Sequence, residues 1–196
     1  MVRTKEIRWF FKNDNEYIKK WFLSLPFNCH EKREDVYLNL KNENIGVKLR
    51  EGAIEIKYRQ GIPEQGYFQP DIEGYFENWT KWSFDTVTNH EKVGIDMVSS
   101  QKDWLTIKKN RLFVIVLYKD DKPVFHPPSN DVEGIQIEFT ELMVNEREKW
   151  YTFSFECSVD TPLRLNRLLL KTILGDTKLS TMDSMGYAAF LDKSQS

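Results

Sequence analysis

The stretch DVYLNLKNENIGVKLREGAIEIKYR, Asp35 to Arg59, decides how the rest of the chain is interpreted. Its second half predicts two strands that turn at Glu51-Gly52, because glycine tolerates the positive φ that a two-residue hairpin loop needs. A turn at that point pairs Arg50 with Ala53 and fixes the register of the hairpin. Side chains alternate between the two faces of a strand, so this register assigns every side chain of the hairpin to one face.

The two faces of the predicted hairpin differ in chemistry. One face is apolar and pairs Ile45 with Tyr58, Val47 with Ile56, and Leu49 with Ile54. The other face carries Lys48, Arg50, Glu55, Lys57 and Arg59. Four cations on one face repel each other unless water or an anion screens them. The cationic face is therefore either solvated or a site for an anion.

Composition limits the classes of function. The chain has 196 residues, 40% of them hydrophobic and 30% charged, which is enough for a core of ordinary size. We expect a single domain over residues 1–196, since no repeat or linker divides the sequence. The net charge of −2 argues against a nucleic-acid binder with a globally basic surface, so the cationic face must be local.

The same composition bears on location and assembly. The longest apolar run, Leu112 to Tyr118, is far shorter than the ~20 residues that cross a bilayer, so no membrane passage is expected. The chain has only Cys29 and Cys157, and its first residues lack the apolar core of a signal peptide, which makes a cytoplasmic location the default. An aromatic content of 14% leaves a homodimer open.

Alternation of apolar and polar residues predicts further strands along most of the chain. We expect them at Thr4–Phe11, Arg33–Leu40, Ile72–Phe84, Ile135–Thr140 and Tyr151–Cys157, with a hairpin over Trp104–Tyr118 that turns near Asn110. Two segments, Gly61–Pro70 and Asp120–Asp131, are expected to be loops because they are rich in turn-forming residues.

Helical spacing predicts two helices. The first runs from Tyr17 to Leu25 and is capped by Asn13 or Asp14, and the second runs from Thr161 to Leu174. Residues 85–103 show too little periodicity for an assignment. This inventory predicts a mainly β (α+β) fold, an antiparallel eight-stranded closed or nearly closed barrel with two or three covering helices. A meander is the simplest strand order.

Nearly every predicted strand has one polar face that carries charge, and two interpretations follow. The polar faces can be the solvated side of sheets whose apolar side forms the core. Alternatively, they line the inside of a closed barrel, where basic groups bind phosphate and carboxylates hold a divalent cation. Periodicity alone leaves both interpretations open.

Several segments, taken in order, resemble a known family. They are the initial strand and helix, the hairpin GVKLREGAIEIKYR, the acidic strand YTFSFEC, and the closing DSMGYAAFL, Asp183 to Leu191. This layout resembles the CYTH superfamily of triphosphate-tunnel proteins, which includes class IV adenylate cyclases, thiamine triphosphatases and inorganic triphosphatases. The resemblance implies an eight-stranded barrel whose tunnel binds triphosphate between basic side chains and a Mg²⁺ or Mn²⁺ ion held by glutamates.

The family's motifs are only partly kept in this chain. The family begins with Glu-x-Glu-x-Lys on its first strand, where this chain has Glu6, Arg8 and Phe10, and its paired late glutamates become Ser154 and Glu156. Replacing a carboxylate by arginine removes a metal ligand and adds repulsion toward a cation. The resemblance implies phosphate-binding residues Arg8, Lys48, Arg50, Lys57, Arg59 and Lys81, and metal ligands Glu6, Glu138 and Glu156.

We therefore expect a tunnel that binds a small phosphate-bearing anion, with metal-dependent triphosphate hydrolysis weakened or lost. No catalytic residue can be named from the sequence, and no nucleic-acid partner is expected. Two alternatives remain open. Phe10 and Tyr37 also project from the polar faces, which favours a more hydrophobic small ligand. In the other alternative, the chain is a non-enzymatic interaction domain whose basic face is merely solvated.

Overall fold

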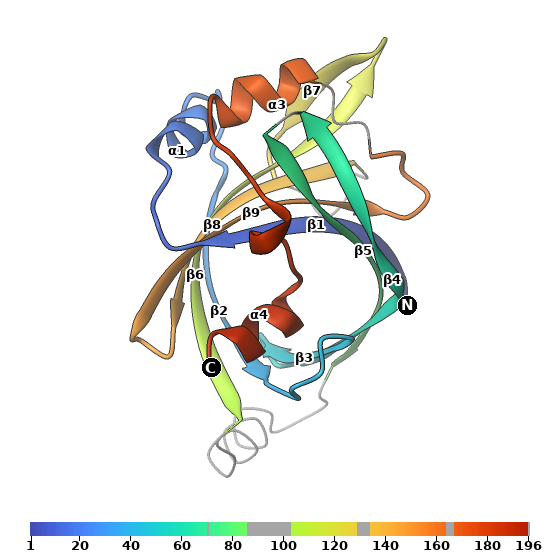
Figure 1. Ribbon diagram of the computed structural model, residues 1–196, viewed down its shortest axis with the longest axis vertical. Coiled ribbons are helices and arrows are strands. Elements are labelled where there is room, and N and C mark those ends of the chain that lie inside the picture. The colour runs from blue at the N-terminus through green and yellow to red at the C-terminus, as the bar shows by residue number, and fades with distance from the viewer. Residues whose placement is uncertain (70, 86–102, 129–133, 164–166, 196) are drawn as a thin grey trace.

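The computed structural model describes residues 1–69, 71–85, 103–128, 134–163 and 167–195. Eight antiparallel strands in these ranges close into a barrel (Figure 1), which confirms the expected fold class. The barrel strands are β1 (Val2–Phe11), β2 (His30–Leu38), β3 (Ile45–Arg50), β4 (Ala53–Gln69), β5 (Ile72–Asp85), β6 (Trp104–Lys119), β8 (Ile135–Val144) and β9 (Glu148–Ser158). A short strand, β7 (Lys122–His126), pairs with β6 outside the ring.

The strand order around the barrel is β1-β5-β4-β3-β2-β6-β8-β9, and it departs from a simple meander at one strand. β1 lies between β5 and β9, while β2 closes the ring by pairing with β6. A tight turn forces two strands to be neighbours. Residues 12–29 instead contain the helix α1 (Glu16–Leu23), so β2 is free to pair far from β1.

The register of the β3–β4 hairpin is the one expected from the sequence. Arg50 pairs with Ala53, and the turn residues Glu51 and Gly52 have φ of 48° and 79°. Positive φ at both central residues defines a type I′ turn, whose twist matches that of the flanking strands. The cationic side chains therefore share one face, and that face points into the barrel rather than to solvent.

The expected hairpin over Trp104–Tyr118 is wrong, because β6 is one continuous strand through this region. Asn110, the expected turn residue, pairs with Lys32 of β2 on one side and with Glu141 of β8 on the other. The polar run Lys108-Lys109-Asn110 imitates a turn in the sequence. In the barrel its residues alternate between the two faces, with Lys109 pointing inward.

Both expected loops also contain strand. β4 continues through the segment Gly61–Gln69 after an irregularity between Gln60 and Glu64, where Gly61 has φ of 73°. Lys122–His126 forms β7 after a two-residue turn at Asp120 and Asp121, whose φ values are 49° and 58°. Glycine and proline interrupt these strands locally without ending them, because edge and bulge positions tolerate both residues.

Three α-helices occur in the described ranges, in addition to the short 3₁₀ helix η1 (Thr181–Asp183). The cap of α1 is Asn15 rather than Asn13 or Asp14, and its side chain accepts a hydrogen bond from Ile18 N at 3.1 Å. The second expected helix is present as α3 (Arg167–Leu174), and residues 164–166 lie outside the described residues. The third, α4 (Tyr187–Lys193), had no expected counterpart. No described helix is both long and apolar enough to cross a membrane.

The apolar residues form two clusters on opposite sides of the barrel wall. The larger cluster lies outside β1, β8 and β9, where α1 and α3 cover buried side chains including Trp9, Phe22, Ile137, Phe155 and Leu170. The smaller cluster lies inside one end of the barrel, around Phe10, Tyr37 and Phe190. α4 thus fills the barrel end from within (Figure 1), unlike the two helices that cover the outside.

We expect Gly52→Ala to lower the free energy of unfolding by about 1 kcal/mol, because an L side chain is disfavoured at positive φ. Gly46→Ala in the same hairpin is the matched control, since Gly46 lacks a positive φ and a Cβ there would lie 3.9 Å from Lys57 Cβ. Urea unfolding followed by fluorescence measures both. Equal losses in the two variants would contradict the turn assignment.

Candidate functional site

The polar faces of the strands enclose a cavity of about 390 Å³ inside the barrel. All eight barrel strands and α4 contribute side chains to its wall. The apolar cluster of Phe10, Tyr37 and Phe190 blocks one end. At the other end several charged side chains are 22–36% exposed: Glu31, Arg50, Lys57 and Glu156. The cavity is therefore a pocket with a charged mouth and a closed apolar end.

Eight of the nine residues expected from the sequence lie in this wall. They are Arg8, Lys48, Arg50, Lys57, Lys81, Glu6, Glu138 and Glu156. Arg59 is buried beside the wall, where it binds Glu77 Oε1 at 2.9 Å and Glu43 Oε1 at 2.7 Å. Its guanidinium is committed to these two carboxylates, so Arg59 is poorly placed to bind a ligand in the cavity.

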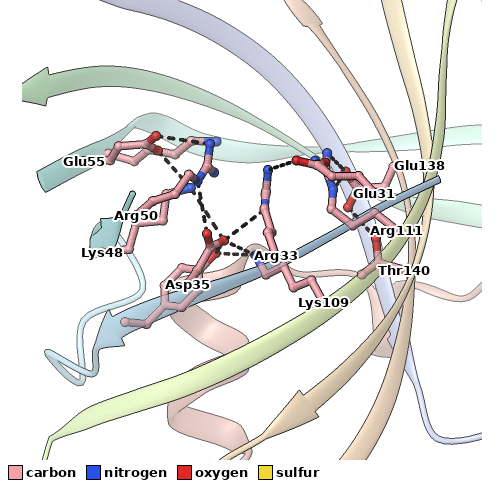
Figure 2. Close-up of polar contacts among 12 residues, drawn as sticks. Glu31, Arg33, Asp35, Lys48, Arg50, Glu55, Lys109, Arg111, Glu138 and Thr140 are labelled. Carbon is pink, nitrogen blue, oxygen red and sulfur yellow. Dashed lines mark hydrogen bonds and ion pairs between the residues drawn. The ribbon is translucent and has the colours of Figure 1, made fainter. Parts of the chain in front are cut away.

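Asp35 is the centre of the densest charge cluster (Figure 2). Its side chain is fully buried, and four cations lie within 4 Å of its carboxylate: Lys109 at 2.7 Å, Arg50 at 3.1 Å, Arg33 at 3.5 Å and Lys48 at 3.9 Å. Burial by itself would raise the pKa of Asp35, but these cations, led by Lys109, hold that pKa well below its usual value. Asp35 therefore stays ionised.

The lysines of this cluster are crowded by other cations. Burial, reinforced by Arg50, lowers the pKa of Lys48 to about 7 in spite of its contacts with Asp35 and with Glu55 at 2.8 Å. Burial also lowers the pKa of Lys109 well below its usual value, with Arg33 and Lys48 acting in the same direction. Both lysines lose their protons more easily than lysines in water, because they are buried and lie next to other cations.

Glu138 is the centre of a second cluster. Its Oε1 lies 3.3 Å from Arg8 Nη1 and accepts from Thr140 Oγ1 at 2.8 Å, and its Oε2 accepts from Arg111 Nε at 3.0 Å. Burial would raise the pKa of Glu138, but Arg111 and Arg8 hold it well below its usual value. Glu31 joins the two clusters, since it forms ion pairs with both Arg111 and Arg33 (Figure 2).

The two clusters thus form one connected network across the cavity. It contains six basic side chains, Arg8, Arg33, Lys48, Arg50, Lys109 and Arg111, against four carboxylates, Glu31, Asp35, Glu55 and Glu138. At such short range in a poorly solvated interior, uncompensated charge is costly. The network is therefore short of negative charge, and an added anion would supply it.

Two more lysines stand near the mouth of the cavity. Lys57 Nζ lies 3.3 Å from Glu6 Oε2 and 3.5 Å from Glu156 Oε1. Although burial would lower the pKa of Lys57, these two carboxylates raise it above its usual value. Lys81 also lines the wall, and within the described residues no ion pair or hydrogen bond of its ammonium is found. Lys81 is thus available to an incoming anion.

The three carboxylates expected to hold a metal are each paired with basic side chains of the wall. Glu6 and Glu156 share Lys57, whereas Glu138 binds Arg8 and Arg111. Over the described ranges, no group of three His, Cys, Asp or Glu side chains has the geometry of a metal site. A Mg²⁺ or Mn²⁺ ion prefers several free oxygen ligands. The site therefore does not fit such an ion in this arrangement.

Several further wall or network residues were missed from the sequence, among them Arg33, Asp35, Lys109, Arg111 and Tyr187. The first two share the polar face of β2 with Tyr37, so alternation alone could have included them. Lys109 and Arg111 were hidden by the wrongly expected turn at Asn110. Tyr187 reaches the cavity because α4 enters the barrel, and no local pattern in the sequence predicts that this helix lies inside.

Comparisons with known proteins add little to this geometry. The chain matches no protein-family model, and a search of the curated proteins finds no match. Among solved structures, it is similar to a conserved hypothetical protein from Pyrococcus furiosus, with 16% sequence identity and a TM-score of 0.42 over 94% of this chain and 98% of that chain. A likeness at this level carries no argument about function, so the proposals below rest on the site alone.

We expect Asp35→Asn to lower the free energy of unfolding by about 3 kcal/mol, since it leaves buried cations without their carboxylate. Glu146→Gln is the control, because Glu146 forms an exposed ion pair with Lys108, and exposed ion pairs contribute little to stability. Urea unfolding at pH 7 compares the two variants with the parent protein. A loss in Asp35→Asn no larger than in the control would show that Asp35 does not hold the cluster together.

Proposed function

We propose that the barrel interior binds a small phosphate-bearing polyanion, such as a triphosphate group. The observation that carries this proposal is that the connected network holds six basic side chains and only four carboxylates. A polyanion would supply the missing negative charge to Lys48 and Lys109 and would favour their protonated forms. We therefore expect the anion to bind most strongly beside Lys48 and Lys109, the two lysines whose pKa values are lowered in the empty site.

The chemistry of the wall supports phosphate as the recognised group. Arginine and lysine form short, charge-assisted hydrogen bonds to phosphate oxygens, and arginine can bind two oxygens at once. Arg50 and Lys81 line a partly exposed part of the wall, where an entering anion can reach them. A volume of about 390 Å³ falls in the range of small-ligand pockets.

We place binding ahead of hydrolysis. Metal-dependent phosphoryl transfer needs several carboxylates gathered on one ion. In this protein Glu6, Glu138 and Glu156 are each bound to cations of the wall. Those cations would have to leave before a metal could bind. A free phosphate-bearing ligand of this kind also agrees with the cytoplasmic location expected from the sequence.

We expect the protein to bind linear tripolyphosphate in the presence of a metal chelator, as measured by isothermal titration calorimetry. Lys81→Ala should weaken binding about tenfold, which corresponds to one lost hydrogen bond between charged groups. Lys108→Ala is the matched control, because Lys108 is half exposed outside the cavity and pairs with Glu146. No heat of binding at millimolar ligand would refute the proposal. An equal loss in both lysine variants would place the anion elsewhere.

Lys48 should make this binding depend on pH. Its pKa of about 7 in the empty site means that Lys48 is charged below pH 7 and must take up a proton to pair with an anion above it. The affinity for tripolyphosphate should therefore fall as the pH rises above 7, by no more than about tenfold for each pH unit.

Lys48→Arg is the comparison, since arginine stays charged over this range. The affinity of both proteins for tripolyphosphate is measured between pH 6 and 8.5. The ligand ionises in the same way in both experiments, so only the difference between the two slopes of affinity against pH reports on Lys48. Parallel slopes would exclude Lys48 as the source of the pH dependence.

A further inference from the structure

Near the closed end of the cavity, three buried polar atoms have no hydrogen-bond partner within the described residues: Arg8 Nε, Ser154 Oγ and the hydroxyl oxygen of Tyr187. Buried polar groups nearly always form hydrogen bonds in native proteins, so three buried atoms without a partner are unusual. Arg8 and Tyr187 both belong to the cavity wall. Ser154 lies directly across from Arg8 on the neighbouring strand β9.

The Arg8 guanidinium and the Tyr187 ring are in contact, with Arg8 Cζ 4.9 Å from the ring centroid. Arg8 uses Nη1 to bind Glu138 at 3.3 Å, which leaves Nε free to donate elsewhere. On the same ring, Lys109 Nζ lies 4.1 Å from the centroid. The Tyr187 hydroxyl thus belongs to a ring flanked by two cations.

The segment that carries Tyr187 is fixed to the strand that carries Arg8. Met185 N donates to the carbonyl oxygen of Arg8 at 3.0 Å, and Ser184 forms a β-bridge with Trp9. Ser184 Oγ also accepts from Tyr75 N of β5 at 2.8 Å. These hydrogen bonds fix the position of Tyr187 relative to Arg8. A binding site needs its hydrogen-bond donors held in place in this way.

Burial raises the pKa of Tyr187 above its usual value, although Arg8 opposes this shift. The hydroxyl therefore keeps its proton at neutral pH and acts as a hydrogen-bond donor. Arg8 Nε is likewise a donor only. Both groups need an acceptor, and the cations nearby favour one that is negatively charged.

The cavity beyond these donors ends in apolar side chains. Phe10 and Phe190 stack there, with their ring centroids 4.0 Å apart, and Phe10 also meets the Tyr187 ring at 5.3 Å. A ligand that enters from the charged mouth therefore reaches Arg8 and Tyr187 with its leading end. Within the described residues, this apolar cluster has no charged side chain that would pair with further charge on the ligand.

We propose that Arg8 Nε and the Tyr187 hydroxyl form a deep subsite for the terminal phosphoryl group of the ligand. The inference rests on the proposed binding of a phosphate-bearing polyanion and adds which part of it is recognised. The ligand class is then a linear phosphate chain or a phosphate monoester, whose terminal group carries several free oxygens. A cyclic or internal phosphodiester lacks such a group and would fill the subsite poorly.

The experiment compares linear tripolyphosphate with cyclic trimetaphosphate by isothermal titration calorimetry, in the presence of a metal chelator. Tyr187→Phe keeps the ring and removes only the hydroxyl, so it should weaken binding of the linear compound about tenfold and leave the cyclic compound unaffected. Tyr58→Phe is the control, because Tyr58 is exposed on the outer face of the hairpin. Lys81→Ala should weaken both compounds by the same factor.

The outcomes separate the two proposals. If Tyr187→Phe binds both compounds as the parent protein does, the deep subsite is refuted while the proposed function stands. A loss of both compounds by the same factor in Tyr187→Phe refutes it as well, since the hydroxyl then does not distinguish a terminal group. If the parent protein binds neither compound, the proposed function fails and the subsite fails with it. A thermal melt of Tyr187→Phe with an unchanged midpoint shows that the fold is intact.

Discussion

The arrangement of the barrel interior depends on one carboxylate, that of Asp35, which is fully buried among four cations. These cations come from three strands, β2, β3 and β6, and two of those strands, β2 and β6, form the pairing that closes the ring. Like charges at this spacing would otherwise push the strands apart. One negative charge thus allows a closed barrel to keep a cationic interior, and it is too little to neutralise that interior.

The shortage of negative charge links stability to binding. A protein whose interior is fully neutralised gains little from an added anion, whereas this network leaves Lys48 and Lys109 with lowered pKa values. A ligand that binds only the folded protein stabilises it in proportion to the logarithm of the ligand concentration. The empty barrel is therefore expected to be the less stable form, because its cations are held together without enough counter-charge.

Local patterns in the sequence predict those parts of the site that a tight turn fixes. Glu51-Gly52 determines the register of the β3–β4 hairpin, and with it the common face of Lys48, Arg50 and Lys57, which the structure places inside the barrel. Residues whose surroundings are set by distant strands could not be placed in this way. Arg59 shares the face of the hairpin that carries these residues, yet it is bound by Glu77 of β5, a strand whose pairing with β4 the hairpin turn does not set.

The pairing of β1 with β9 has a consequence for the order in which the site is assembled. β1 supplies Glu6 and Arg8 from the start of the chain, but Thr4 of this strand pairs with Ser158 near the end of β9. During synthesis the ribosome must therefore produce all eight barrel strands before the wall around Arg8 is complete. Such long-range pairing slows folding. In the nascent chain the two parts of the cavity wall therefore stay separate until the last strands have been synthesised.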